Sequence, residues 1–122
     1  MKKYKYLTIF ISFLFFSCNE KILTIEKNEI NIGKLRTNEK KEINIQINNE
    51  SNTSINILKI QPSCKCIINN NLKTTKTLKP NDVFELKITY KSEEKGDFNE
   101  TIVIYSDSEK PFEIIKIKSS VI

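Results

Sequence analysis

The feature that most constrains the fold is a regular alternation of isoleucine with polar residues along several stretches of the chain. In one of them, Ile43, Ile45 and Ile47 alternate with Asn44 and Gln46. Successive side chains of a β-strand point to opposite faces, so a period of two indicates a strand with one buried face. Isoleucine also favours extended backbone, because its branched Cβ restricts χ1. The pattern therefore predicts strands, and no stretch of the sequence shows a sustained helical period.

Six stretches are predicted as strands, with turn-forming residues between them. The strands are expected around Ile30–Ile32, Ile43–Ile47, Ile55–Ile60, Phe84–Tyr90, Ile102–Tyr105 and Glu113–Val121. In the third stretch, Ile55 and Ile57 alternate in one phase and Leu58 and Ile60 in the other. This change of phase indicates either a β-bulge or a strand buried on both faces. Strands and turns at this spacing predict a single all-β sandwich of about seven strands.

The composition excludes several kinds of chemistry. The 122 residues include no histidine, which rules out Ser–His and Cys–His nucleophile pairs and imidazole metal ligands. The two glycines, Gly33 and Gly96, are too far apart for a Gly-rich phosphate-binding loop. The adjacent carboxylates Glu93 and Glu94 lie in a predicted turn, where solvent surrounds both and no opposed catalytic environments arise. We therefore expect no enzymatic activity, no cofactor and no resident metal.

The N-terminus resembles the export signal of a bacterial lipoprotein. Lys2, Lys3 and Lys5 precede an apolar run at residues 7–16, which is too short to span a bilayer of ~30 Å as a helix. The sequence Phe-Phe-Ser-Cys that ends at Cys18 resembles the lipobox, whose cysteine is lipidated and becomes the first mature residue. An ordinary cleaved signal and an uncleaved hydrophobic anchor are the alternatives.

Lipidation at Cys18 would fix the location and change the charge. Two or more acyl chains, such as palmitate, anchor a protein stably to a membrane, whereas one chain binds reversibly. Removal of the signal takes three of the 20 basic residues, which leaves 17 against 15 acidic ones and lowers the net charge from +5 to +2. We expect a signal peptide at 1–17, a lipidated tether at 18–23 and a sandwich domain at 24–122. The expected location is the bacterial cell envelope, at the periplasmic face or the outer membrane surface.

Five motifs occur in order along residues 24–122. They are Ile32-Gly33-Lys34-Leu35, the strand Ile43–Ile47 followed by Asn49, Ser63-Cys64-Lys65-Cys66, Leu78-Lys79-Pro80-Asn81-Asp82, and Lys95-Gly96-Asp97-Phe98 with Ile102–Asp107. This set resembles the bacterial family called domain of unknown function 1573. The resemblance implies an immunoglobulin-like module of the kind common in envelope lipoproteins, and it implies no activity. Lys65 and Asn81 replace glycines of the family pattern, and a glycine-type conformation would be mild for Asn but strained for Lys.

If Cys18 carries lipid, Cys64 and Cys66 are the two cysteines that remain. Three interpretations of this pair are open. In a regular strand their Cα atoms would be ~6.5–7 Å apart, so a disulfide needs a bend, which Pro62 would help to make. Such a small ring would be easily reduced and therefore redox-active. Alternatively, two thiolates suit Cu(I) or Zn(II), although the chain offers few further ligands. The third interpretation is a structural pair without further function.

Basic residues gather in the middle third of the chain, where residues 51–81 contain no acidic side chain. Lys65, Lys73, Lys76 and Lys79 are a candidate surface for anionic lipid headgroups, a glycolipid or an acidic protein. The alternative is a solvated loop in a lysine-rich protein. Nucleic acid is not an expected partner, because arginine and base-stacking aromatic residues are missing from this stretch.

Two functions follow from these observations. The first is a lipid-anchored, non-catalytic module that binds or scaffolds an unknown envelope protein or anionic glycolipid. Its partner would dock on a strand edge or on the loops from Cys64 to Thr77. The second is a thiol-based envelope protein that uses Cys64 and Cys66 for redox or soft-metal chemistry.

Overall fold

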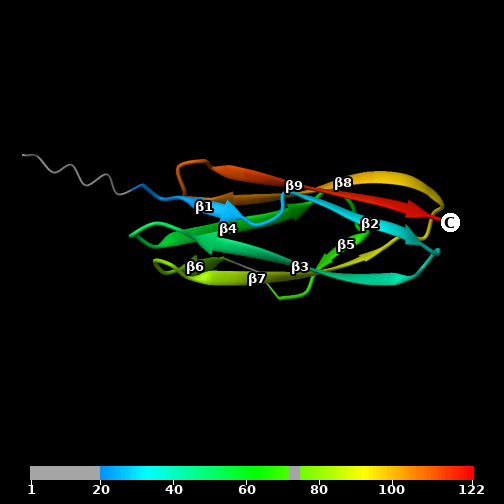
Figure 1. The fold of residues 1–122 in the computed structure, drawn as a ribbon, viewed down its shortest axis with the longest axis horizontal. Coiled ribbons are helices and arrows are strands. Elements are labelled where there is room, and N and C mark those ends of the chain that lie inside the picture. Colours follow the sequence, from blue (N-terminus) through cyan, green and yellow to red (C-terminus); the bar gives the residue numbers. More distant parts are fainter. Residues whose placement is uncertain (1–19, 72–74) are drawn as a thin grey trace, which may run out of the picture.

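The computed structural model describes residues 20–71 and 75–122, which form two β-sheets packed face to face (Figure 1). The strands are β1 (Leu23–Ile25), β2 (Glu29–Leu35), β3 (Lys40–Asn49), β4 (Ile55–Pro62), β5 (Ile67–Asn69), β6 (Lys76–Leu78), β7 (Val83–Lys91), β8 (Gly96–Ser106) and β9 (Phe112–Val121). One sheet has the order β1-β3-β7-β5 and the other β2-β9-β8-β4-β6. The predicted all-β sandwich is thus confirmed. Over the described ranges, no helix is long and apolar enough to cross a bilayer.

One strand pairing joins the two ends of the domain. β2 runs parallel to β9, whereas the other ladders are antiparallel. Parallel neighbours need a long connection, and here the rest of the sandwich provides it. The register of β2 shifts between Asn31 and Gly33, where the backbone φ of Gly33 is 88°. Glycine tolerates this left-handed conformation, so the bulge costs little at that position.

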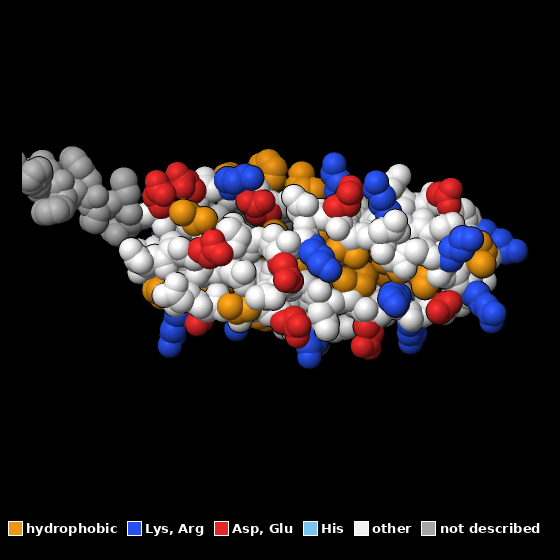
Figure 2. All heavy atoms as spheres, in the orientation of Figure 1, with side chains coloured by type: hydrophobic (Ala, Val, Ile, Leu, Met, Phe, Trp, Pro, Cys, Tyr) orange, Lys and Arg blue, Asp and Glu red, His pale blue; other side chains and the backbone are white. Residues whose placement is uncertain are grey.

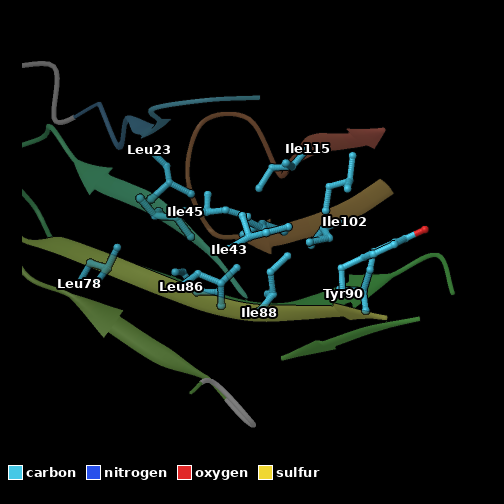
Figure 3. Close-up of a cluster of buried hydrophobic side chains, with 14 of the residues drawn as sticks. Leu23, Ile43, Ile45, Leu78, Leu86, Ile88, Tyr90, Ile102 and Ile115 are labelled. Atoms are coloured by element: carbon cyan, nitrogen blue, oxygen red, sulfur yellow. The ribbon is translucent and has the colours of Figure 1, made fainter. Parts of the chain in front are cut away.

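The alternating isoleucines form the core between the sheets. Ile45 and Ile88 of the first sheet point toward Ile102 and Ile115 of the second (Figure 3). All four side chains are buried, and burial of each stabilises the fold by roughly 1.5–3 kcal/mol. Tyr90 also belongs to the core, and its buried hydroxyl forms a hydrogen bond of 2.6 Å with Ser119 Oγ. Both buried polar groups are therefore satisfied.

The structure answers three questions about the local backbone that the sequence raised. The register between β4 and β8 shifts between Ile57 and Lys59, and the side chain of Leu58 is 51% exposed. The phase change in β4 is therefore a bulge, and burial on both faces is wrong. Asn81 has a φ of 66°, the glycine-type conformation that Asn tolerates. Lys65 has no positive φ, so it does not adopt the glycine-type conformation that would be strained for lysine.

Asp107 ties the start of the domain to the turn between β8 and β9. Its Oδ1 accepts a hydrogen bond of 2.8 Å from the backbone N–H of Asn56. Its Oδ2 accepts one of 3.0 Å from Asn56 Nδ2 and one of 3.2 Å from Lys21 Nζ. The backbone N–H of Glu109 also donates to the carbonyl of Lys21, at 2.8 Å. The residues that lead into β1 are thereby held against the β8–β9 turn.

We expect Asp107 to make the stability of the fold depend on acid pH. Burial raises the pKa of Asp107, but the hydrogen bonds from Asn56 and Lys21 outweigh it, so the pKa lies below its ordinary value of 3.8. The carboxylate therefore contributes stability above about pH 4, and this contribution is lost as the pH falls through the lowered pKa of the folded state.

Urea titrations of the wild type and Asp107→Asn at pH 7 and pH 3 check this prediction. The variant should be less stable at pH 7, and the difference should shrink at pH 3. Asp97→Asn, a change at an exposed carboxylate, is the matched control. An equal deficit of Asp107→Asn at both pH values would contradict the assignment.

Candidate functional site

The segment with Cys64 and Cys66 carries the chain from one sheet to the other. β4 ends at Pro62 in the five-stranded sheet, and β5 begins at Ile67 in the four-stranded sheet. Proline has no backbone N–H to donate to a sheet ladder, which suits the end of a strand. The intervening residues form a bend and a turn, so the cysteines are not in regular strand geometry.

Hydrogen bonds fix this turn on both sides. The N–H of Ser63 donates to the carbonyl of Thr101 at 2.8 Å, and the N–H of Thr101 donates to Ser63 Oγ at 2.8 Å. Ser63 Oγ in turn donates to Glu100 Oε1 at 2.7 Å. On the other sheet, the N–H of Lys91 donates to the carbonyl of Cys66 at 2.9 Å. The turn is therefore held to β8 and to β7 at once.

Cys64 and Cys66 are joined by a disulfide, and their Cα atoms are 5.1 Å apart. This distance lies within the usual range for disulfides, which the bend in the chain makes possible. Both cysteines are half-buried and line a pocket of about 400 Å³. Tyr90 and Phe98 contribute apolar surface to the pocket, and Glu100 contributes a carboxylate. A partner or a small thiol can therefore approach the disulfide from one side.

Glu100 is the residue of this site that the sequence did not indicate. Its carboxylate and the two sulfur atoms lie within 4.8 Å of one another. In the disulfide form neither sulfur is a thiolate, so the site offers no sulfur ligand to a metal ion. After reduction, two thiolates and one carboxylate oxygen would give three ligands, which would suit a soft or borderline cation. Glu100 reaches the pair only through the register of β8, so sequence spacing gave no sign of it.

We expect the disulfide to contribute little to global stability. It closes a loop of only three residues, and in the chain-entropy account such a loop stabilises a fold by about 1–2 kcal/mol, less than the roughly 3 kcal/mol of a 15-residue loop. Urea unfolding should therefore be a single cooperative transition both with and without dithiothreitol. The free energy of unfolding should differ between the two conditions by no more than this amount. Loss of the folded state on reduction would contradict the prediction and mark the pair as an essential structural link.

Among the candidate anion-binding lysines that the structure describes, Lys65 and Lys76 lie near opposite ends of β4. Lys65 is exposed beside the disulfide, after the end of β4. Lys76 pairs with Ile57 near the start of β4, and its ammonium lies 5.1 Å from the ring centroid of Phe84. The end of β4, which Lys65 follows, is five residues from Ile57, or about 17 Å along the strand. Lys76 is therefore far from Lys65. Lys79 is exposed directly after the end of β6, and the predicted positions Lys73 and Cys18 lie outside the described residues.

Sequence comparison identifies one family over almost the whole described domain. The family model described as "Protein of unknown function (DUF1573)" matches residues 23–121. Among curated proteins, none matches this chain. The family pattern thus covers both sheets and the turn with the disulfide.

Solved structures share the fold at low sequence identity. The PapD-like domain 7 of human CEP192 is 12% identical with a TM-score of 0.70, and the match covers 94% of this chain and 97% of that one. A protein of unknown function from Porphyromonas gingivalis is 16% identical with a TM-score of 0.72, covering 87% of this chain and 49% of that one. The secreted serine protease VesC from Vibrio cholerae is 14% identical with a TM-score of 0.65, covering 81% and 23% respectively. These likenesses establish a PapD-like or immunoglobulin-like sandwich, which in the last two cases is part of a longer chain.

Proposed function

The chain belongs to the DUF1573 family, and from that premise we propose that it is a lipid-anchored, non-catalytic module of the bacterial cell envelope. In this proposal the sandwich binds or scaffolds an envelope protein or an anionic glycolipid. Cys18 carries the lipid, and the domain acts as a rigid body that presents its loops to the partner. A fold of this kind hosts many functions, so the proposal depends on the surfaces of this chain and not on the fold alone.

The observation that carries the proposal is the position where the chain enters the sandwich. β1 begins at Leu23, only five residues after Cys18. Lys21 is held against the β8–β9 turn, so an acyl anchor at Cys18 would keep this turn close to the bilayer. Thr101, which contacts Ser63 beside the disulfide, lies five residues from the end of β8, or about 17 Å along the strand. The turn with the disulfide would therefore point away from the membrane.

The surface around that turn has the features of a docking site. β5 is an edge strand of the four-stranded sheet, and its Ile68 is exposed. Extended segments of partner proteins commonly add to such edges, with neighbouring pockets that select side chains. The adjacent pocket offers apolar rings together with the charged groups of Lys65 and Glu100. These features support a protein partner somewhat more directly than a glycolipid.

Site-specific photo-cross-linking in native membranes tests the proposal. A photoreactive residue at Lys65 should capture one discrete envelope partner, which mass spectrometry then identifies. The matched control is the same residue at Lys79, an exposed lysine at the other end of β4. No adduct at Lys65, or equal and diffuse adducts at both positions, would argue against a docking surface at the disulfide turn.

A thiol-based activity is the second candidate, and the disulfide on an open pocket favours it. In such a reaction a partner dithiol would attack the disulfide through a mixed disulfide. The partner would lose two electrons and two protons and become a disulfide, while Cys64 and Cys66 would become two thiols. Soft-metal binding by the reduced pair with Glu100 is the related alternative.

Thiol titration separates this candidate from the binding module. The purified protein is titrated before and after reduction, and the reduced form is offered Cu(I) and Zn(II). Reversible oxidation by a physiological dithiol–disulfide couple, or stoichiometric metal uptake that Glu100→Gln weakens, would support thiol chemistry. If neither occurs and Cys64→Ser leaves partner capture at Lys65 intact, the pair is structural.

A further inference from the structure

The outer face of the five-stranded sheet carries a group of apolar side chains that the core does not use. Leu58, Tyr105, Phe112 and Ile114 are exposed by 51%, 36%, 49% and 43%. Half-buried Val103 lies among them, because it pairs directly with Ile114, just as Tyr105 pairs with Phe112. Figure 2 shows apolar side chains over the region where β9 begins in Figure 1. We call these five residues, on β4, β8 and β9, the outer apolar face.

The clustering of these residues is unusual for the surface of this domain. Four of the eight large apolar side chains that are exposed in the described chain belong to this face. The others include Ile68 and Val83 on the opposite sheet and Ile122 at the C-terminus. Single exposed apolar residues need no explanation, but a contiguous group on three neighbouring strands marks an interaction surface.

The outer apolar face lies at the end where the chain enters the domain. Tyr105 and Phe112 flank the turn that holds Lys21 through Asp107 and Glu109. Cys18 is three residues before Lys21, so it is at most about 10 Å away along the chain. A lipid on Cys18 therefore leaves this face within reach of the bilayer surface, and the tether is too short to carry the domain far from it. The geometry thus selects one occupant, the membrane that holds the anchor.

The chemistry of the face agrees with that occupant. Tyrosine favours the membrane–water interface, where its ring sits at headgroup depth. The ammonium of Lys59 lies 5.9 Å from the ring centroid of Tyr105, and Lys116 follows Ile114 on the same face of β9. Lysines at the border of an apolar surface can place their stems along it and their charges near lipid phosphates. Apolar rings and aliphatic chains bordered by lysines form the surface of an interfacial membrane contact.

We propose that the outer apolar face rests on the bilayer, so that the lipoprotein leans on its five-stranded sheet instead of swinging freely on its tether. This inference rests on the proposed lipid anchor and adds a second, weaker membrane contact to it. The contact would orient the molecule and direct the disulfide turn and the edge of β5 toward the periplasmic or external space. A second copy or another protein on the same face is the competing occupant.

A tryptophan reporter tests the proposal, since the chain contains no tryptophan of its own. Phe112→Trp and, as a second reporter, Ile114→Trp are made in the full-length lipoprotein and reconstituted into vesicles of phosphatidylethanolamine and phosphatidylglycerol with brominated acyl chains. A side chain that penetrates about 5–10 Å into the interface contacts these chains and should lose roughly half or more of its emission. The control, Ile68→Trp on β5, should lose very little.

The outcomes separate this inference from the proposed anchor. Quenching of Phe112→Trp or Ile114→Trp, with Ile68→Trp unaffected, supports the membrane contact. If the protein sediments with vesicles but neither reporter is quenched by brominated lipid, the anchor stands and the contact is wrong. If these reporters are instead shielded from both brominated lipid and aqueous acrylamide, a protein covers the face, and the membrane contact is again wrong. Failure of the wild type to carry lipid at all would refute the proposed anchor first.

Discussion

Replacing Asn49 with alanine should lower the free energy of unfolding by about 3 kcal/mol or more, because several buried polar groups lose their partner together. The side chain is 1% exposed at the end of β3. Its Nδ2 donates to the carbonyls of Thr53 at 2.9 Å, Leu78 at 2.9 Å and Lys79 at 3.1 Å. Its Oδ1 accepts hydrogen bonds from the N–H and the Oγ of Ser51. One amide thus connects β3, the turn after it and the end of β6.

Urea unfolding followed by far-ultraviolet circular dichroism measures this loss. Asn44→Ala is the matched control, because Asn44 lies on the same strand with its side chain exposed. An exposed substitution of this kind normally changes stability by less than about 0.5 kcal/mol. Equal midpoints for Asn49→Ala and the wild type would show that the amide network does not stabilise the fold.

Replacing Cys18 with alanine should abolish the incorporation of fatty acid. The thioether requires the cysteine sulfur, and no neighbouring side chain can replace it. Each buried CH₂ contributes about 0.8 kcal/mol, so the loss of several acyl chains removes a membrane affinity that no other single substitution would match. Metabolic labelling with a fatty acid, followed by purification of the protein, measures the effect.

The control for the Cys18 experiment is Cys64→Ala, which removes a different cysteine. This variant should keep the full label, because Cys64 lies within the folded domain and is half-buried. Label that persists in Cys18→Ala, or that disappears in Cys64→Ala, would place the modification elsewhere and remove the basis of the proposed anchor.

The long strands followed from the sequence because each has one buried face. β3, β7 and β9 show clean alternation, and the isoleucine, leucine and tyrosine side chains that the pattern assigned to the buried face are buried in the structure. The short strands β1, β5 and β6 were not predicted, because three residues cannot show a period of two. Their pairing depends on neighbours far away in the sequence. The parallel pairing of β2 with β9 depends in the same way on the complete sandwich.

The candidate site was predictable in its covalent part and not in its surroundings. The Cys-x-Cys spacing and Pro62 indicated that a disulfide requires a bend, and the turn between the sheets provides that bend. Glu100 and the pocket come from β8 and β7, so only the register of those strands brings them to the cysteines. Charge spacing alone was a poor guide, since Lys65 and Lys76 are close in sequence but lie near opposite ends of β4.

The intact mass of the native protein, purified from the membranes of its producer, tests the central claim most directly. The account predicts a chain that begins at Cys18 and carries at least two fatty acyl groups on that residue, with the domain folded behind a tether of a few residues. A chain that begins at Met1, a chain cleaved at another residue, or a mature chain without acyl groups would contradict the account.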